Sequence, residues 1–579
     1  MNGEILQTVL YLIVLVLLAV PLGKYIGKVM DGEKVFLSRA VEPLENLVYR
    51  SLKIDRDEQM GWKKYAVSAL LFNLFGFLLF FAVNLIQNIL PLNPQHLGGV
   101  SWDLAFNTAV SFVTNTNWQA YSGENTLSYF SQMFACTVQN FVSAATGIAV
   151  LFALICGFVR VRESGIGSFW TDMVRSVLYI LLPLSLVVSV VLVSQGVVQN
   201  FNSYDKVSLL QPVAVSGGAA VTSEVVPEGP AASQIAIKQL GTNGGGFFGT
   251  NSAHPFENPT AASDMLELIS ILLIPVALCF TFGRNVKDKR QGRALFAAMF
   301  IVLVGCLGFT LFSEMHATPQ LIQNGAVGTS FVNQSGGNME GKEVRFGVGA
   351  SSTWAVFTTA ASSGSVNAMH DSLTPIGGLI PMLLMELGEV IFGGVGCGLY
   401  GILGFAIFTV FIAGLMVGRT PEYLGKKIEP FEMRMAVLVC LASPVAVLIG
   451  SGIACMMPGI ASTLGNAGAH GFSEILYDFS SAAGNNGSAF GGMASNTLFM
   501  NISTGLIMLF VRYVPMVAVL AMAGSLVRKK KVAVSAGTLP THDAMFVGLL
   551  IFFVFLIGAL SFFPALALGP GADYSQMIR

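Results

Sequence analysis

The chain has 579 residues, of which 54% are hydrophobic and only 11% are charged, and its mean hydropathy is +0.69. Soluble domains carry roughly 25% charged residues, so this composition excludes an ordinary soluble protein and is typical of a membrane protein. The formal net charge of −1 provides no bulk attraction to nucleic acid, and we expect no nucleic-acid partner.

About ten apolar runs are long enough to cross a lipid bilayer, which requires roughly 20 apolar residues per helix. The run at 376–416 is too long for one straight crossing, and the sequence GGVGCG (Gly393–Gly398) at its centre predicts a broken helix. We therefore expect an all-α polytopic membrane protein. In chain order the runs lie at roughly 5–27, 64–88, 130–158, 174–198, 264–283, 295–313, 376–416, 434–457, 499–524 and 544–568.

Lysine and arginine gather in alternate loops between these runs. Basic clusters follow the first, third, fifth, seventh and ninth runs, whereas Met435 to Val511 contains no lysine or arginine. By the positive-inside rule the basic loops are cytoplasmic, so both termini are predicted outside. The alternation agrees with ten crossings.

Four segments in the outer loops share one pattern, in which a short and mildly apolar helical stretch leads into a polar tetrad. The third positions of the tetrads, 116, 244, 364 and 487, are separated by 128, 120 and 123 residues. This near-constant period indicates internal duplication. The tetrads are Thr114-Asn115-Thr116-Asn117, Thr242-Asn243-Gly244-Gly245, Ser362-Ser363-Gly364-Ser365 and Asn485-Asn486-Gly487-Ser488.

The composition of the tetrads favours a site for a dehydrated cation. Irregular backbone at membrane depth persists only where it lines a cavity or is buried in protein, and rings of carbonyl oxygens replace the water shell of an ion. Glycine tolerates the positive φ angles that such a ring needs, and helix C-termini favour positive charge. Thr116 stands where the other tetrads have glycine, so an asymmetric ring is expected. Ordinary surface turns are the alternative, which four tetrads at one period disfavour.

Several stretches closely resemble one family: VTNTNWQAYSGE, IKQLGTNGGGFFGTNSAHPFENPT, GEVIFGGVG, FIAGLMVGRTPEYLGKKIEP and NNGSAFGG. They are similar to the potassium-binding subunits of bacterial Kdp potassium-importing ATPases, and the likeness runs from the first span to the last. The resemblance implies the channel-like, K+-selecting subunit of a hetero-oligomer in the bacterial inner membrane.

The resemblance also implies an architecture of four span–pore–span repeats, arranged pseudo-fourfold around a K+ filter, with one extra span at each end. We expect a single transmembrane domain over 1–579. Its parts are an extra N-terminal helix at 1–30, the repeats at 62–160, 169–283, 292–418 and 432–526, and an extra C-terminal helix and tail at 543–579.

The partners implied are a P-type ATPase subunit, which binds ATP, and two small membrane subunits. The sequence agrees that ATP chemistry lies elsewhere, because it contains no Walker-type loop and no Asp-Lys-Thr-Gly phosphorylation motif. We expect K+ as the transported ion, with no organic cofactor and no catalytic site on this chain. Arg419, at a cytoplasmic helix end, either contacts the ATPase partner or is a solvated cation that sets orientation.

Carried over residue by residue, the selectivity filter of the family maps to the four tetrads. Thr116, Gly244, Gly364 and Gly487 take its central positions, and backbone carbonyls of the filter are expected to bind the ion. Gln119 follows the first tetrad and resembles the filter-flanking glutamine of the family.

The gating segment of the family corresponds to the broken helix, at Gly393, Gly394 and Gly396. Glu389 and Arg512 lie inside apolar runs. Because intramembrane charges are costly and usually face protein or water, both are predicted to line the exit path below the filter. A structural ion pair between repeats is the alternative.

Two rival functions remain open at this point. A stand-alone channel-like or ion-coupled potassium transporter of the same superfamily would share the filter but need no ATPase, and its isolated chain would carry current. A non-transporting membrane scaffold or receptor would tolerate substitutions in the tetrads without any change in potassium uptake.

Overall fold

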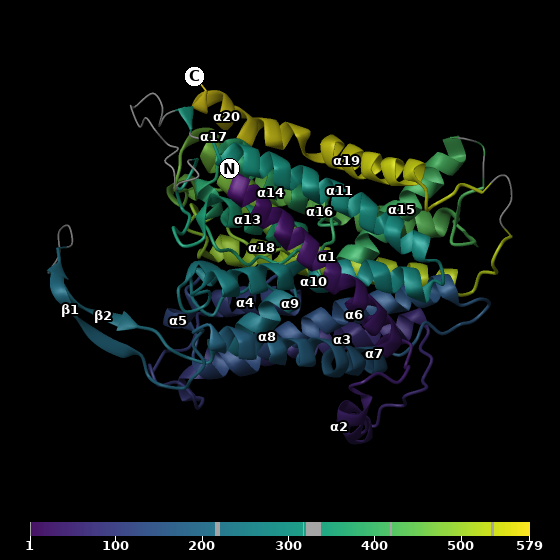
Figure 1. The fold of residues 1–579 in the computed structure, drawn as a ribbon, viewed down its shortest axis with the longest axis horizontal. Helices are drawn as coiled ribbons and strands as arrows, with labels where there is room; N and C mark the ends of the chain where they lie inside the picture. Colours follow the sequence, from purple (N-terminus) through teal and green to yellow (C-terminus); the bar gives the residue numbers. More distant parts are fainter. Residues whose placement is uncertain are drawn as a thin grey trace.

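The computed structural model describes residues 2–214, 220–316, 318–319, 337–416, 418, 420–533 and 538–578. Within these residues, ten helical segments are long and apolar enough to span a membrane, as predicted (Figure 1). They are α1 (Asn2–Met30), α3 (Trp62–Ile86), α6 (Val138–Val159), α7 with α8 (Phe169–Arg175 and Leu182–Ser194), α10 (Ala261–Asn285), α11 (Lys289–Glu314), α15 (Cys397–Met416), α16 (Pro430–Met456), α18 (Leu498–Leu526) and α19 with α20 (Ala544–Leu566 and Ala572–Met577).

Four shorter helices end directly before the four tetrads or one residue earlier, as the repeated pattern predicted. With 10 to 17 residues each, they are too short to cross the roughly 30 Å hydrocarbon core. Most of their residues are buried, so they lie inside the bundle among the spans. They are α4 (Trp102–Val113), α9 (Ala231–Leu240), α13 (Gly347–Ala360) and α17 (Gly468–Gly484).

Small elements complete the described fold. Both chain ends lie at one end of the bundle, from which the antiparallel hairpin β1–β2 projects, and α2 lies beside the bundle (Figure 1). An even number of spans requires termini on a common side. The small elements are α2 (Ser38–Leu52), α5 (Gly123–Thr126), α14 (Pro375–Glu386), β1 (Asp205–Val213), β2 (Val221–Val226), β3 (Glu422–Tyr423) and β4 (Lys426–Lys427).

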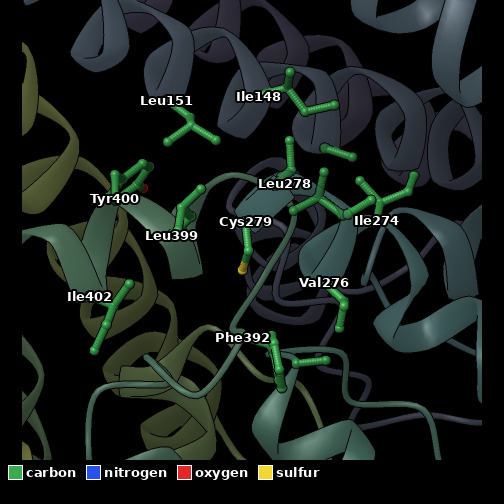
Figure 2. Close-up of a cluster of buried hydrophobic side chains, with 14 of the residues drawn as sticks. Ile148, Leu151, Ile274, Val276, Leu278, Cys279, Phe392, Leu399, Tyr400 and Ile402 are labelled. Carbon is green, nitrogen blue, oxygen red and sulfur yellow. The ribbon is translucent and has the colours of Figure 1, made fainter. Parts of the chain in front are cut away.

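The spans divide into central and peripheral helices. In α6 and α10 respectively, 83% and 78% of the most apolar stretch is buried, against 22% in α1 and α3, which expose leucines such as Leu17 and Leu71. Figure 2 shows the central packing, where Ile148 of α6, Leu278 of α10 and Leu399 of α15 belong to one buried cluster. The central helices thus form a rigid support for the tetrads, and the peripheral ones present apolar side chains to lipid.

The predicted broken helix is confirmed. α14 ends at Glu386 and α15 begins at Cys397, and the segment between them is buried and irregular. A Cβ added to Gly396, where φ is +85°, would lie 2.1 Å from the carbonyl oxygen of Gly147 in α6. Glycine is required there because the two backbones touch. Phe392 of this segment and Val276 of α10, both labelled in Figure 2, belong to the same buried cluster.

Candidate ion-binding site

The backbone leaves all four short helices in the same way. In each tetrad one backbone N–H donates to the carbonyl oxygen five residues earlier, at 2.8 to 3.0 Å. The donors are Thr116, Asn243, Ser363 and Asn486, and the acceptors are Ser111, Lys238, Thr358 and Ser481. Positive φ angles then occur in pairs two residues apart: Asn115 and Asn117, Thr242 and Gly244, Ser362 and Gly364, and Asn485 and Gly487.

These regularities correct the register expected for the first repeat. Asn117, and not Thr116, corresponds to Gly244, Gly364 and Gly487, so the corresponding positions are separated by 127, 120 and 123 residues. The expected alignment was one residue off because it matched tetrads by composition. Asparagine adopts left-handed backbone more readily than a β-branched residue does, although Thr242 of the second tetrad also takes it, with a φ of 49°. Thr116 accordingly keeps ordinary backbone, and the positive φ of 53° falls on Asn117.

The four tetrads contact one another in chain order, and the fourth returns to the first. At each of the three glycines, a carbonyl oxygen of the next tetrad stands where a Cβ would lie. A Cβ built on Gly244 would lie 1.9 Å from the carbonyl oxygen of Ser363. The corresponding distances are 2.3 Å from a Cβ on Gly364 to the oxygen of Asn486 and 1.8 Å from a Cβ on Gly487 to the oxygen of Thr116. The first and second tetrads are joined by a hydrogen bond, in which Nδ2 of Asn115 donates to the carbonyl oxygen of Thr242 at 2.9 Å.

Side chains reinforce this cycle. Oγ of Ser362 donates to the carbonyl oxygen of Asn485 at 3.0 Å, and Nδ2 of Asn485 donates to Oγ1 of Thr116 at the same distance. Oγ1 of Thr242 accepts from the N–H of Val395 at 3.0 Å, which attaches the second tetrad to the broken helix. The polar residues of the tetrads are all buried, so these bonds are shielded from water.

Gln119 holds the chain that follows the second tetrad. Its Nε2 donates to the carbonyl oxygen of Gly246 at 3.1 Å, and its Oε1 accepts from the N–H of the same residue at 2.9 Å. Gln119 therefore links the chain after the first tetrad to the chain after the second.

Two cavities contact the tetrads at different positions. The larger cavity, of about 560 Å³, is lined by Asn117, Gly364 and Gly487, together with Gln119. The smaller cavity, of about 70 Å³, is lined by Ser362 and Asn485, among others. Within a tetrad, the residues that line the larger cavity come two positions after those that line the smaller cavity, as Gly364 follows Ser362. The two cavities therefore adjoin opposite ends of the tetrads.

Glu389 and Arg512 both line the smaller cavity, as does Gly394. Nη1 of Arg512 lies 3.1 Å from Sγ of Cys397, and among the described residues no ion pair joins Arg512 to Glu389. The carboxyl carbon of Glu389 would lie 2.9 Å from a Cβ added to Gly484, the last residue of α17. Glu389 thus lies beside the C-terminus of α17 and shares the smaller cavity with the guanidinium of Arg512.

A buried ion pair behind the second tetrad was missed by the sequence analysis. Lys238, in the last turn of α9, pairs with Glu257, and both side chains are 0% exposed. Nζ of Lys238 also donates to Oδ1 of Asn251 at 2.7 Å, and Nδ2 of Asn251 donates to the carbonyl oxygen of Gly244 at 2.6 Å. The charge is thereby connected to the tetrad. A lone lysine in an otherwise uncharged helix was the signal available in the sequence.

A second polar cluster, also missed, connects the C-terminal helix to the chain after the third tetrad. His470 lies 3.0 Å from Asp371 and 2.8 Å from Asp573 through its two ring nitrogens. Hydrogen bonds to Asp371 and then Asp573 raise the pKa of His470 to about 10. Ligand atoms of Asp371, His470 and Glu474 lie within 4.8 Å of one another, a donor set able to bind a metal ion.

Because the pKa of His470 rises on folding from 6.5, its contribution to stability is complete below pH 6.5 and is lost as the pH approaches about 10. We expect the difference in unfolding midpoint between the parent and His470→Gln to shrink over this interval. Thermal unfolding of the purified protein at pH 6.5 and at pH 10 measures it, with the exposed His96→Gln as control. A gap that is constant with pH would contradict the assignment.

Residues 9–574 match the family model described as "Potassium-transporting ATPase A subunit". The chain is 68% identical over 578 residues to the "Potassium-transporting ATPase potassium-binding subunit" of Clostridium botulinum (strain Alaska E43 / Type E3), and the match covers 100% of both chains. A protein of the same description from Desulfovibrio desulfuricans is 59% identical over 583 residues, again covering 100% of both chains.

Proposed function

Because this chain belongs to the family of potassium-transporting ATPase A subunits, we propose that it is the potassium-binding, potassium-selecting subunit of an ATP-driven importer. The observation that carries the proposal is the cycle of contacts among the four tetrads. In the proposed function, K+ enters from outside, is bound by the tetrads and passes toward the ATPase subunit.

In this proposal the tetrads form the selectivity filter at the centre of four pseudo-fourfold repeats. Main-chain carbonyl oxygens replace the hydration shell of K+, so no carboxylate is needed in the tetrads themselves. The C-terminal ends of α4, α9, α13 and α17 stand directly before them and add negative potential. In this proposal K+ enters the filter from the larger cavity and leaves it into the smaller cavity.

The proposed complex contains a P-type ATPase subunit that binds ATP and two small membrane subunits. It lies in the bacterial inner membrane, with both termini of this chain outside, as the basic loops predict. Arg419, considered for contact with the ATPase subunit, lies outside the described residues.

The function is tested by co-expression and transport. The chain, produced with its partner subunits in cells that lack other potassium uptake, should restore growth at low K+ and co-purify with an ATPase. Potassium currents from the isolated chain, without a co-purifying ATPase, would instead support the stand-alone transporter.

We further propose that Glu389 and Arg512 line the exit path. Glu389→Gln and Arg512→Gln should each lower potassium uptake by about tenfold or more while the complex still assembles, because each removes a charge that faces the smaller cavity. Uptake of K+ and co-purification of the partners are measured in parallel.

Glu386→Gln is the matched control, because Glu386 is a buried glutamate of α14 and is absent from the residues that line this cavity. If Glu389→Gln and Arg512→Gln prevent assembly, the two residues have a structural role and the exit-path proposal is wrong.

A further inference from the structure

One hydrogen bond distinguishes the first tetrad from the other three. Asn117 occupies the position at which those tetrads have glycine, with a φ angle of 53°. Its Nδ2 donates to Oδ1 of Asn140 in α6 at 2.7 Å, and the two residues are 2% and 0% exposed. Asn140 belongs to none of the tetrads and lies 23 residues away along the chain.

The second tetrad is shaped to accept this side chain. A Cβ added to Gly245 would lie 2.9 Å from both Cβ and Nδ2 of Asn117. The third and fourth tetrads have Ser365 and Ser488 at the position of Gly245. The side chain of Asn117 thus fills the space that Gly245 leaves by lacking a side chain. The larger residue in the first tetrad is compensated by the smaller one in the second.

We propose that Asn140 is a positioning residue of the ion-binding site. Through its hydrogen bond to Asn117, it holds the first tetrad against the second and so sets the affinity for K+ and the discrimination between K+ and Rb+. This inference rests on the proposed function and deepens it, because it assigns the geometry of one quarter of the filter to a residue outside the filter.

The hydrogen bond to Asn140 is needed because no neighbouring tetrad packs against the Cα of Asn117 as it does against the three glycines. At Gly244, Gly364 and Gly487 the next tetrad packs directly against the Cα, whereas Asn117 carries a side chain that must be placed. The remaining polar atoms of the two amides, Oδ1 of Asn117 and Nδ2 of Asn140, have no hydrogen-bond partner among the described residues. Loss of the single bond between them would leave buried amide groups unsatisfied, which is costlier than loss of an exposed bond.

The test uses the whole complex and measures the KM and maximal rate of K+ uptake and the ratio of K+ to Rb+ uptake. Asn140→Ala should raise the KM for K+ by about three- to tenfold, the effect of one lost buried hydrogen bond, and lower the K+/Rb+ ratio. The maximal rate should change little. Gln139→Ala is the matched control: Gln139 is the neighbouring buried amide of α6, and its Oε1 lies near Gly76 of α3, away from the tetrads.

A double substitution separates positioning from a general structural role. In an Asn117→Gly background, Asn140→Ala should have no further effect on the KM or the ratio, because the bond is already absent. The proposal would be overturned if Asn140→Ala raised the KM as much in the Asn117→Gly background as in the parent. It would also be overturned if Asn140→Ala left the KM of the parent unchanged.

Should Asn140→Ala fail to assemble, Asn117→Gly alone decides the question, because glycine adopts the same backbone without strain. A raised KM in that variant supports the proposal, and a parental KM overturns it. Failure of the proposed function is a separate outcome, in which even Gly244→Asp leaves selective uptake intact.

Discussion

Gly244→Asp is expected to reduce selective potassium uptake to below roughly one-hundredth of the parental rate, because a misplacement of about 1 Å at a site of this kind costs that much. The Cβ of the new residue would lie 1.9 Å from the carbonyl oxygen of Ser363 and 2.4 Å from the N of Ser365. The φ angle of +81° is also unfavourable for any side chain. The second tetrad must therefore move away from the third, and a carboxylate enters the ring.

Uptake of K+ and of Na+ in cells, with co-purification of the partners, measures this effect. Gly244→Ala isolates the steric part from the charge, and Gly305→Ala is its matched control, since a Cβ on Gly305 of α11 meets nothing within 4 Å. Normal selective uptake by an assembled Gly244→Asp complex would favour the scaffold or receptor over the importer.

Lys238→Met is expected to destabilise the protein by about 3–5 kcal/mol, because it leaves Glu257 as an uncompensated buried charge. The ammonium group also holds Asn251, which donates to the carbonyl oxygen of Gly244. We therefore expect weaker potassium binding in whatever fraction still folds. Thermal unfolding of the purified complex measures the stability, and the KM for K+ uptake measures the binding.

The double variant Lys238→Met/Glu257→Gln should recover much of the lost stability, because neither charge is then left alone. Lys206→Met, on the exposed hairpin β1, is the control for removal of a lysine and should change the unfolding midpoint little. Equal destabilisation by the single and double variants would show that the ion pair is not the source of the effect.

These networks surround the proposed cation site, whose tetrads contain no carboxylates. The tetrads contribute carbonyl oxygens and follow helix C-termini. The charged side chains, Lys238, Glu257 and Glu389, lie outside the tetrads. Lys238 is compensated by Glu257, whereas Glu389 faces the smaller cavity without an ion-pair partner among the described residues. Arg512 lines the same cavity, so one acidic and one basic side chain stand at this end of the tetrads, with no ion pair between them among the described residues.

Much of this protein could be predicted from local sequence. The ten spans, a break in the run at 376–416 and the four short helices before the tetrads each follow from the composition of a local run of residues. The break lies at 387–396, so it overlaps the predicted centre at Gly393–Gly398 but begins earlier. The period of the tetrads is likewise a property of the linear sequence, and the resemblance to one family rests on contiguous motifs.

Tertiary structure alone decided which residue of the first tetrad corresponds to the glycines, and which side chains hold the tetrads in place. Asn117, and not Thr116, has the left-handed backbone, and the carbonyl oxygen of Thr116 packs against Gly487, which lies 371 residues later. The bonds of Lys238 and Asn140 likewise join segments that different helices bring together. These bonds join residues 13 to 23 positions apart in the chain, and they leave no periodic trace in the sequence because each depends on how its own helix packs.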